Sequence, residues 1–523
     1  MKRESEGSRA SRALDLRHGW LRPVRIAFVP GPSTPFLDAF LADVAQAFVE
    51  LGHSVTDVPD EATDAFVSTA RFNEPVAWRE SMLFTGRKRY RLSAKPANYT
   101  FVQVRPSELD SVLSHFEREL RKSPASPELA AFPGLAPAAH EVLFEQGRRG
   151  GPYMCLARLL QAQAKTLRAV PVIGDETLVA THVMDLAGAY PRVDGSDRRA
   201  CAQETALRIA THVSTREVAV HEATGDPLPA ASWRTARAPR AMLDVSRALG
   251  ERRFFTRAVL IADLVAVPAI TESIASQYSE GCFATWDPTL DAMVCTASGT
   301  GRPVDKGGLT EDDLALVTDV RPDGTGARVR QVEGLSNHSA SSEAVEFRLM
   351  DVDLPRVRIA GEDQEVPVVR SKLHGHRGVG GYDPRRVEYT PLSPSYQHYL
   401  VSCSTEAQAW AVRDAFSRSQ ALRDPDDPRR VVFTVLPGHG MIAVEKWSAE
   451  RAPFEVLLET MDEGALRVID GVPQGPLEFV DQGGERRLVT GLHGNRGPGR
   501  GSADPTSPPR AAGPRATPPP PPR

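Results

Sequence analysis

Cysteine is scarce in this chain, and its arrangement excludes one class of protein. Five cysteines occur in 523 residues, scattered singly and without a C-x-x-C pair. An odd, dispersed set argues against a disulfide framework and indicates a reducing compartment. Residues 1–22 are charged and lack the apolar run of a signal peptide. We therefore expect a cytoplasmic protein.

Long apolar runs and an excess of one charge are also missing. No stretch approaches the ~20 uninterrupted apolar residues of a transmembrane helix, so no membrane association is expected. The formal net charge of -4 gives no electrostatic reason to expect a nucleic-acid partner. The single basic run, residues 86–91, is typical of a solvated loop. With 41% hydrophobic residues, the chain has the composition of a soluble globular protein of two or three domains.

The first part of the chain alternates strand and helix signals. Residues 24–29 form a short apolar run, and Thr34 and Pro35 can cap and begin a helix that ends at Gly52. A strand from Ser54 completes a βαβ unit. The same alternation continues with strands at 99–104 and 169–173 and helices at 107–120, 152–167 and 177–189. The predicted fold class is α/β, with a Rossmann-like, mostly parallel sheet over residues 23–195.

The pattern changes to consecutive strands near residue 280. Hairpin signals cover 282–296 and 314–332, and further strands are predicted at 356–359, 366–373, 399–403, 431–436 and 441–447, with one helix at 405–422. Residues 280–485 are therefore predicted to form an antiparallel β-rich C-terminal domain with an inserted helix. Residues 196–279 are a second α/β or helical segment. We expect residues 1–22 and the Pro/Gly/Arg-rich stretch 491–523 to be a disordered leader and tail.

Three histidines stand where strands of the second half are expected to end. His374 and His376 are two residues apart, so in a strand they share a face, and His439 lies between Gly438 and Gly440. A catalytic metal site needs about three protein ligands and an open position. The pattern therefore predicts a metal site. Structural histidines that satisfy backbone groups are the alternative interpretation.

Other candidate residues surround this prediction. Glu280, where the β-rich domain begins, is the best placed carboxylate for a metal or a proton. Lys372 and Lys446 lie near the histidine segments and can assist proton transfer or bind an oxyanion, or face solvent.

Two further segments, elsewhere in the sequence, suit ligands. Arg148, Arg149, Gly150 and Gly151 precede a predicted helix and suit an anion, and a plain solvated loop is the alternative interpretation. The turn at residues 31–34 follows the first strand, where open α/β sheets bind ligands, although ordinary helix capping also accounts for it.

The order of domains resembles that of the L-fucose and L-arabinose isomerase superfamily. Ser279-Glu280-Gly281 is similar to the glutamate-glycine segment at the start of the C-terminal domain of that family. The resemblance covers residues 24–480 in architecture but few residues in motif. It implies aldose–ketose isomerisation at a domain junction, with Mn as the cofactor. Glu280, one of the three histidines, and Asp287 or Asp305 would hold the metal.

In that hypothesis the catalytic residues are Glu280, His376 and Lys372, and the substrate is a sugar or an anionic metabolite. The metal set is Glu280, His374, His376 and His439. A Zn-dependent hydrolase or lyase that uses the three histidines is the first alternative. A non-catalytic small-molecule-binding protein is the second. Homo-oligomerisation is left open.

Overall fold

The structure is a computed structural model, and it describes the chain in separate segments. The described residues are 23–29, 31–60, 62–69, 97–105, 167–174, 179–181, 183, 193–195, 197–214, 221–252, 254–255, 281–298, 306–322, 324, 326–336, 339–359, 365–393, 405–437, 439–448, 450–469 and 477–489. Statements about the structure below refer to these residues.

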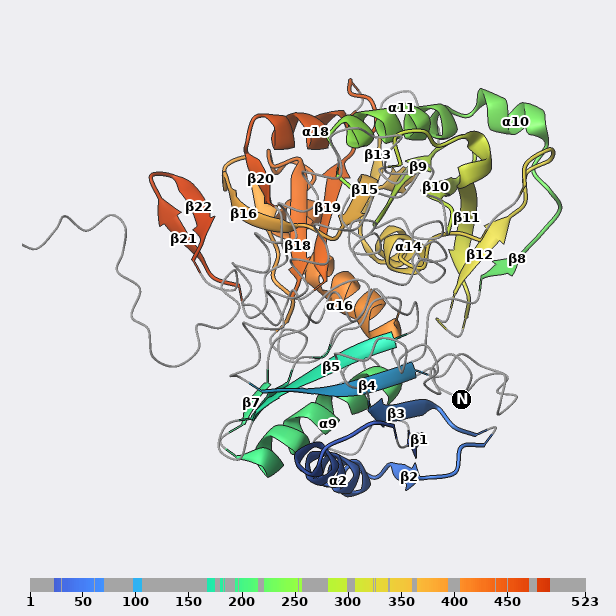
Figure 1. Cartoon of the computed structure of the whole chain (residues 1–523). Helices are drawn as coiled ribbons and strands as arrows, with labels where there is room; N and C mark the ends of the chain where they lie inside the picture. Colours follow the sequence, from blue (N-terminus) through green and yellow to red (C-terminus); the bar gives the residue numbers. More distant parts are fainter. Residues whose placement is uncertain are drawn as a thin grey trace, which may run out of the picture.

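A seven-stranded sheet forms the first layer (Figure 1). In spatial order it consists of β2 (Ser54–Thr56), β1 (Arg25–Val29), β3 (Ala65–Thr69), β4 (Ala97–Val104), β5 (Leu167–Gly174), β6 (Val179–Thr181) and β7 (Val193–Gly195). The strands from β2 to β5 are parallel, and β6 and β7 are antiparallel additions. A parallel sheet in an α/β fold is confirmed.

Two helices cover one face of this sheet. They are α2 (Pro35–Glu50) and α9 (Arg198–Ser214), and they pack against each other as well as on the strands (Figure 1). The predicted cap of α2 is confirmed, because Leu37 N donates to Thr34 Oγ1 at 3.2 Å and Pro35 is the first helical residue. The βαβ unit predicted from residue 24 onward is present as β1, α2 and β2.

A nine-stranded mixed sheet forms the larger layer. In spatial order it consists of β17 (Val387–Tyr389), β18 (Val431–Leu436), β19 (Gly440–Lys446), β15 (Val369–Gly375), β9 (Cys282–Asp287), β10 (Ala292–Thr296), β11 (Leu314–Val320), β12 (Ala327–Arg330) and β8 (Glu222–Ala223). The pairs β12–β8 and β17–β18 are parallel and the others antiparallel. The predicted hairpins at 282–296 and 314–332 are both present.

Helices lie on both faces of the larger sheet (Figure 1). One face packs against α14 (Ala344–Asp353) and α16 (Glu406–Ser417), and the other against α11 (Arg237–Glu251) and α18 (Glu455–Asp462). The shorter helices are α10 (Ala230–Thr235), α17 (Gln420–Arg423) and the 3-10 turn η2 (Glu311–Asp313). None of the described helices combines the length and apolar character that a membrane span requires.

Two small sheets complete the described elements. One pairs β13 (Arg356–Arg358) with β14 (Glu365–Pro367). The other contains β20 (Leu466–Ile469), β16 (Gly378–Tyr382), β22 (Glu485–Leu488) and β21 (Phe479–Gln482), in this order. Four aromatic rings join the second sheet to the larger one, with centroids 4.8 to 6.2 Å apart. These rings belong to Tyr382, Tyr389, Phe433 and Phe479.

Several expectations about the fold need correction. Residues 179–181 of the predicted helix 177–189 form strand β6, because they pair with β5. The β-rich part has several helices where one was predicted, and its main sheet is mixed. The segment 196–279 contributes α9 to the parallel sheet and α11 to the larger one. The helix predicted at 107–120 and the strand at 399–403 lie outside the described residues, and of the helix predicted at 152–167 only Leu167 is described, as the first residue of β5.

Glu445 links the larger sheet to the start of α18. Its carboxylate accepts hydrogen bonds from Leu457 N at 2.8 Å and Phe454 N at 3.1 Å, in place of the missing side-chain cap. Burial raises the pKa of Glu445 to about 7, although these bonds oppose the shift. Glu445 in the folded protein therefore keeps its proton up to about pH 7. In the unfolded chain Glu445 releases this proton near its ordinary pKa of 4.5.

This difference predicts a pH-dependent stability. Between about pH 4.5 and 7 the unfolded state binds fewer protons, so the free energy of unfolding falls as pH rises, by about 3 kcal/mol in total. Glu445→Gln should flatten this slope in urea denaturation curves measured at several pH values. The exposed Glu450→Gln serves as the control. An unchanged slope in Glu445→Gln would contradict the assignment.

Candidate metal centre

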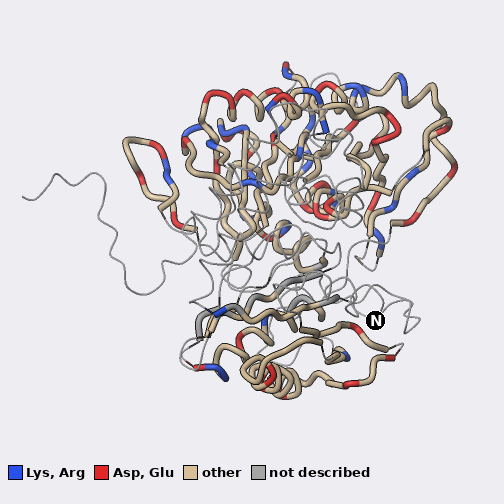
Figure 2. The backbone as a smooth tube through the Cα atoms, viewed as in Figure 1, with Lys and Arg blue, Asp and Glu red and all other residues tan. Residues whose placement is uncertain are grey.

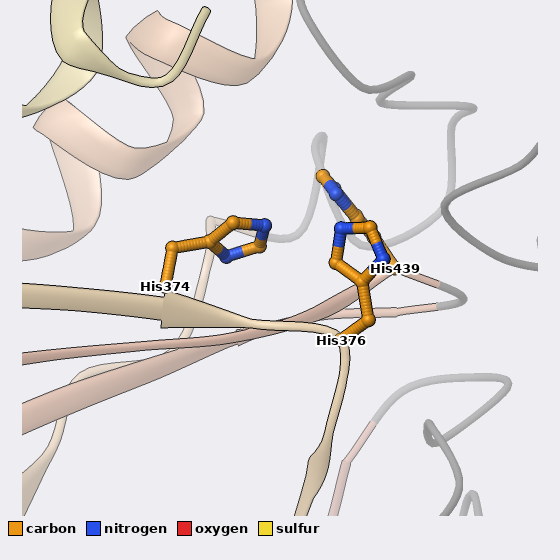
Figure 3. Close-up of side chains that lie close together, drawn as sticks. All are labelled: His374, His376 and His439. Atoms are coloured by element: carbon orange, nitrogen blue, oxygen red, sulfur yellow. The ribbon is translucent and has the colours of Figure 1, made fainter. Parts of the chain in front are cut away.

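The three predicted histidines lie at one end of the central strands. His374 is in β15, and His376 follows this strand directly (Figure 3). His439 occupies the tight turn between β18 and β19, where its N–H donates to Leu436 O at 3.0 Å. Because β15 pairs with β19, this turn lies beside the end of β15. Residues distant in sequence are therefore brought together by strand pairing.

The three imidazole rings lie close together, each pair in an edge-to-face arrangement (Figure 3). Ring centroids are 5.2 Å apart for His374 and His376, 4.8 Å for His374 and His439, and 4.9 Å for His376 and His439. One nitrogen from each ring lies within 4.8 Å of the others. Nitrogens around a tetrahedral Zn ion are about 3.4 Å apart. Side-chain adjustments on the order of 1 Å would therefore give a coordinating geometry.

Close backbone packing fixes these rings in place. A Cβ at Gly440 would lie 2.2 Å from Gly375 O, and one at Gly281 would lie 2.3 Å from His374 O. Only glycine permits such approaches between strands. His374 Nδ1 lies 3.0 Å from Met441 O, which favours Nδ1–H as the donor and directs Nε2 toward the other rings.

A buried carboxylate accompanies the histidines. Glu343 precedes α14 and accepts hydrogen bonds from Ser341 Oγ at 2.5 Å and Ser342 Oγ at 3.1 Å. Burial alone would raise its pKa, but positive charge at His374 and His439, together with the Ser341 bond, lowers the pKa of Glu343 to about 2. The carboxylate therefore stays ionised and favours a cation among the rings.

Lys372 occupies a buried ion pair. Its Nζ lies 2.6 Å from Asp351 Oδ1 of α14, and both side chains are fully buried. Burial lowers the pKa of Lys372 and raises that of Asp351, while their mutual attraction opposes both shifts. This environment favours a structural role that fixes α14 on the sheet. The predicted catalytic role of Lys372 stays a prediction.

The other sequence candidates have different outcomes. Lys446 Nζ donates to the carbonyls of Asp424 at 3.0 Å and Asp427 at 3.1 Å, which stabilises a turn.

Asp287 lies at the opposite end of β9 from Cys282, the strand partner of His374. Its carboxylate accepts a hydrogen bond from Ala238 N at the start of α11. Five residues of strand separate these ends by roughly 16 Å, so Asp287 is not a ligand of this cluster. Glu280, Asp305, Arg148, Arg149, Gly150 and Gly151 lie outside the described residues.

Glu343 was missed by the sequence analysis, although a signal for it existed. Ser341 and Ser342 precede apolar residues at helical spacing, a pattern typical of a helix start. The acidic residues of α14 colour this helix red in Figure 2, and because acidic residues usually face solvent they did not suggest a buried site. Glu346 is one of them, and it is buried and accepts a hydrogen bond from Gln408 Nε2 at 2.9 Å.

Comparison with known proteins identified no relative of this chain. No protein-family model matches it, no curated protein is significantly similar to it, and no solved structure matches it. Functional conclusions therefore depend on the geometry of the site.

The Lys372–Asp351 pair predicts a marked asymmetry between single and double substitutions. Lys372→Met leaves a buried carboxylate unpaired and should lower the free energy of unfolding by about 3–5 kcal/mol. Adding Asp351→Leu should recover most of this loss, because an apolar pair of similar volume leaves no buried charge without a partner. Urea denaturation measures both. Arg247→Met, which removes an exposed ion pair with Asp244, is the control and should change little. Equal stability of single and double variants would contradict the account.

Proposed function

We propose that this protein is a metal-dependent enzyme whose ion is held by His374, His376 and His439. The observation that carries the proposal is the convergence of three buried imidazoles, with one nitrogen of each within 4.8 Å of the others. Three protein ligands with an open position are typical of catalytic rather than structural Zn sites. The reaction class that fits best is Zn-dependent hydrolysis or a lyase reaction.

The donor set favours Zn over Mn. Imidazole nitrogens suit Zn, Cu, Fe and Ni, whereas Mn and Mg prefer carboxylate and water oxygens. Among the described residues, the cluster contains three nitrogens and no carboxylate oxygen. A bound Zn ion would supply a Lewis acid that polarises a carbonyl or phosphoryl oxygen and lowers the pKa of water.

The surrounding residues have separate tasks in this proposal. Glu343 stays ionised and attracts positive charge toward His374 and His439. Met441 O fixes the ring orientation of His374. The Lys372–Asp351 pair holds α14, and with it Glu343, against the sheet.

A Mn-dependent aldose–ketose isomerase is the second candidate. Glu343 favours it, because a buried ionised carboxylate that interacts electrostatically with His374 and His439 could supply an oxygen ligand of the kind that Mn prefers. The resemblance to the L-fucose and L-arabinose isomerase superfamily is consistent with this chemistry. In this case Glu343, with or without Glu280, would join the histidines as a ligand.

Metal analysis tests the proposal directly. Purified protein should contain a single Zn ion per chain by inductively coupled plasma mass spectrometry. His374→Ala and His439→Ala should each lose it, because two imidazoles do not hold the ion. His53→Ala, which alters a buried histidine beside Val24, is the control and should retain the metal. Mn in place of Zn would favour the isomerase. Absence of metal, or its retention in both variants, would overturn the proposal.

The role of Glu343 is tested by a matched pair of substitutions. Glu343→Gln removes the charge beside the histidines and should weaken Zn binding roughly 10- to 100-fold. Glu346→Gln, one helical turn further on, removes the carboxyl that bonds Gln408 and should leave the affinity unchanged. Competition with a chromophoric chelator measures both. Equal affinities in the two variants would show that Glu343 does not act on the metal.

A further inference from the structure

We propose a second ligand site, for a small oxyanion, at the carboxyl edge of the parallel sheet, where Thr69 meets the start of α2. This site is independent of the histidine cluster. The order β2-β1-β3-β4-β5 places β2 and β3 on opposite sides of β1. In open α/β sheets, ligands bind outside the carboxyl ends of the strands, at the point where the strand order reverses. Here that point lies between β1 and β3.

A buried hydroxyl group at this point has no partner. Thr69 ends β3, is 3% exposed, and its Oγ1 has no hydrogen-bond partner among the described residues. A buried polar group without a partner is costly and usually marks a missing water or ligand. A Cβ on Gly31 would lie 2.3 Å from Thr69 O and 3.1 Å from Thr69 Oγ1, so the end of β3 packs closely against the turn that leads into α2.

The side-chain acceptors at the start of α2 are already used. Thr34 Oγ1 donates to Gln103 Oε1, and Gln103 Nε2 donates to Gly174 O at 3.3 Å, so these acceptors are already used. Thr34 also satisfies the N–H groups of the third and fourth helical residues. Pro35, the first helical residue, has no N–H. Phe36 is therefore the remaining first-turn residue whose N–H has no acceptor within the helix. A ligand that supplies acceptor atoms complements this arrangement.

Charge further defines the ligand. The positive end of the α2 dipole points at this edge, and Arg105 directly follows β4 there. Asp38, in the first turn of α2, opposes a high negative charge. The combination favours a small oxyanion of low charge, which is a phosphate group or a carboxylate. Thr69 hydroxyl and Phe36 N–H would donate to its oxygens.

The test uses the full chain after chelator treatment, so that an anion cannot bind a metal ion at the histidines. Inorganic phosphate and acetate are titrated separately by isothermal titration calorimetry. We expect saturable binding of one of them, which identifies the oxyanion. Thr69→Val keeps the shape but removes the hydroxyl and should weaken this binding about tenfold. Thr69→Ser, which retains a hydroxyl, should keep it, and Asp38→Asn should strengthen it.

Ser68→Ala is the matched control. Ser68 precedes Thr69 in the same strand, but its hydroxyl pairs with Thr100 at 3.2 Å, so its loss should leave anion binding unchanged. The site is disproved if neither anion binds, or if Thr69→Val binds as tightly as the unmodified protein. Neither result bears on the metal proposal, which depends on other residues.

Discussion

The pairing register of β15 with β19 is the constraint on which the candidate site depends. It places Gly375 opposite Met441, so that the end of β15 reaches the turn containing His439. Side chains alternate along a strand, and a slip of one residue would turn His374 to the opposite face of the sheet. The contact of Gly375 with Gly440, which leaves no room for a Cβ, fixes this register from the backbone side. Any chemistry at the three histidines requires that this alignment holds.

The second layer of the site comes from α14, whose buried face is unusually acidic. Glu343 interacts electrostatically with His374 and His439, and Asp351 pairs with Lys372, so charges of this segment match charges on the sheet. Buried charge pairs contribute little net stability, but removal of one partner is costly. They therefore fix the position of the helix more than they strengthen the fold. The sequence did not indicate this arrangement, because acidic residues usually face solvent and nothing in the segment itself marks them as buried.

Local signals predicted those parts of the fold that local interactions determine. Thr34, Pro35 and Gly52 mark the ends of α2 within a few residues, and the turn after Asp287 marks the hairpin of β9 and β10. The spacing of His374 and His376 likewise indicated a shared face. Which strands are neighbours was not predictable, since β15 lies between β9 and β19, far apart in sequence. For the same reason, Asp287 was wrongly expected near the metal.

X-ray absorption at the Zn edge tests the central claim most directly, because it reports the atoms bound to the ion itself. The account predicts three imidazole nitrogens at about 2.0–2.1 Å, with the remaining position filled by an oxygen or nitrogen donor and not by sulfur. His439→Ala, exposed to Zn and then freed of unbound metal, should retain no Zn and therefore give no such signal. A site with sulfur ligands, or a spectrum of His439→Ala identical to that of the unmodified protein, would contradict the account.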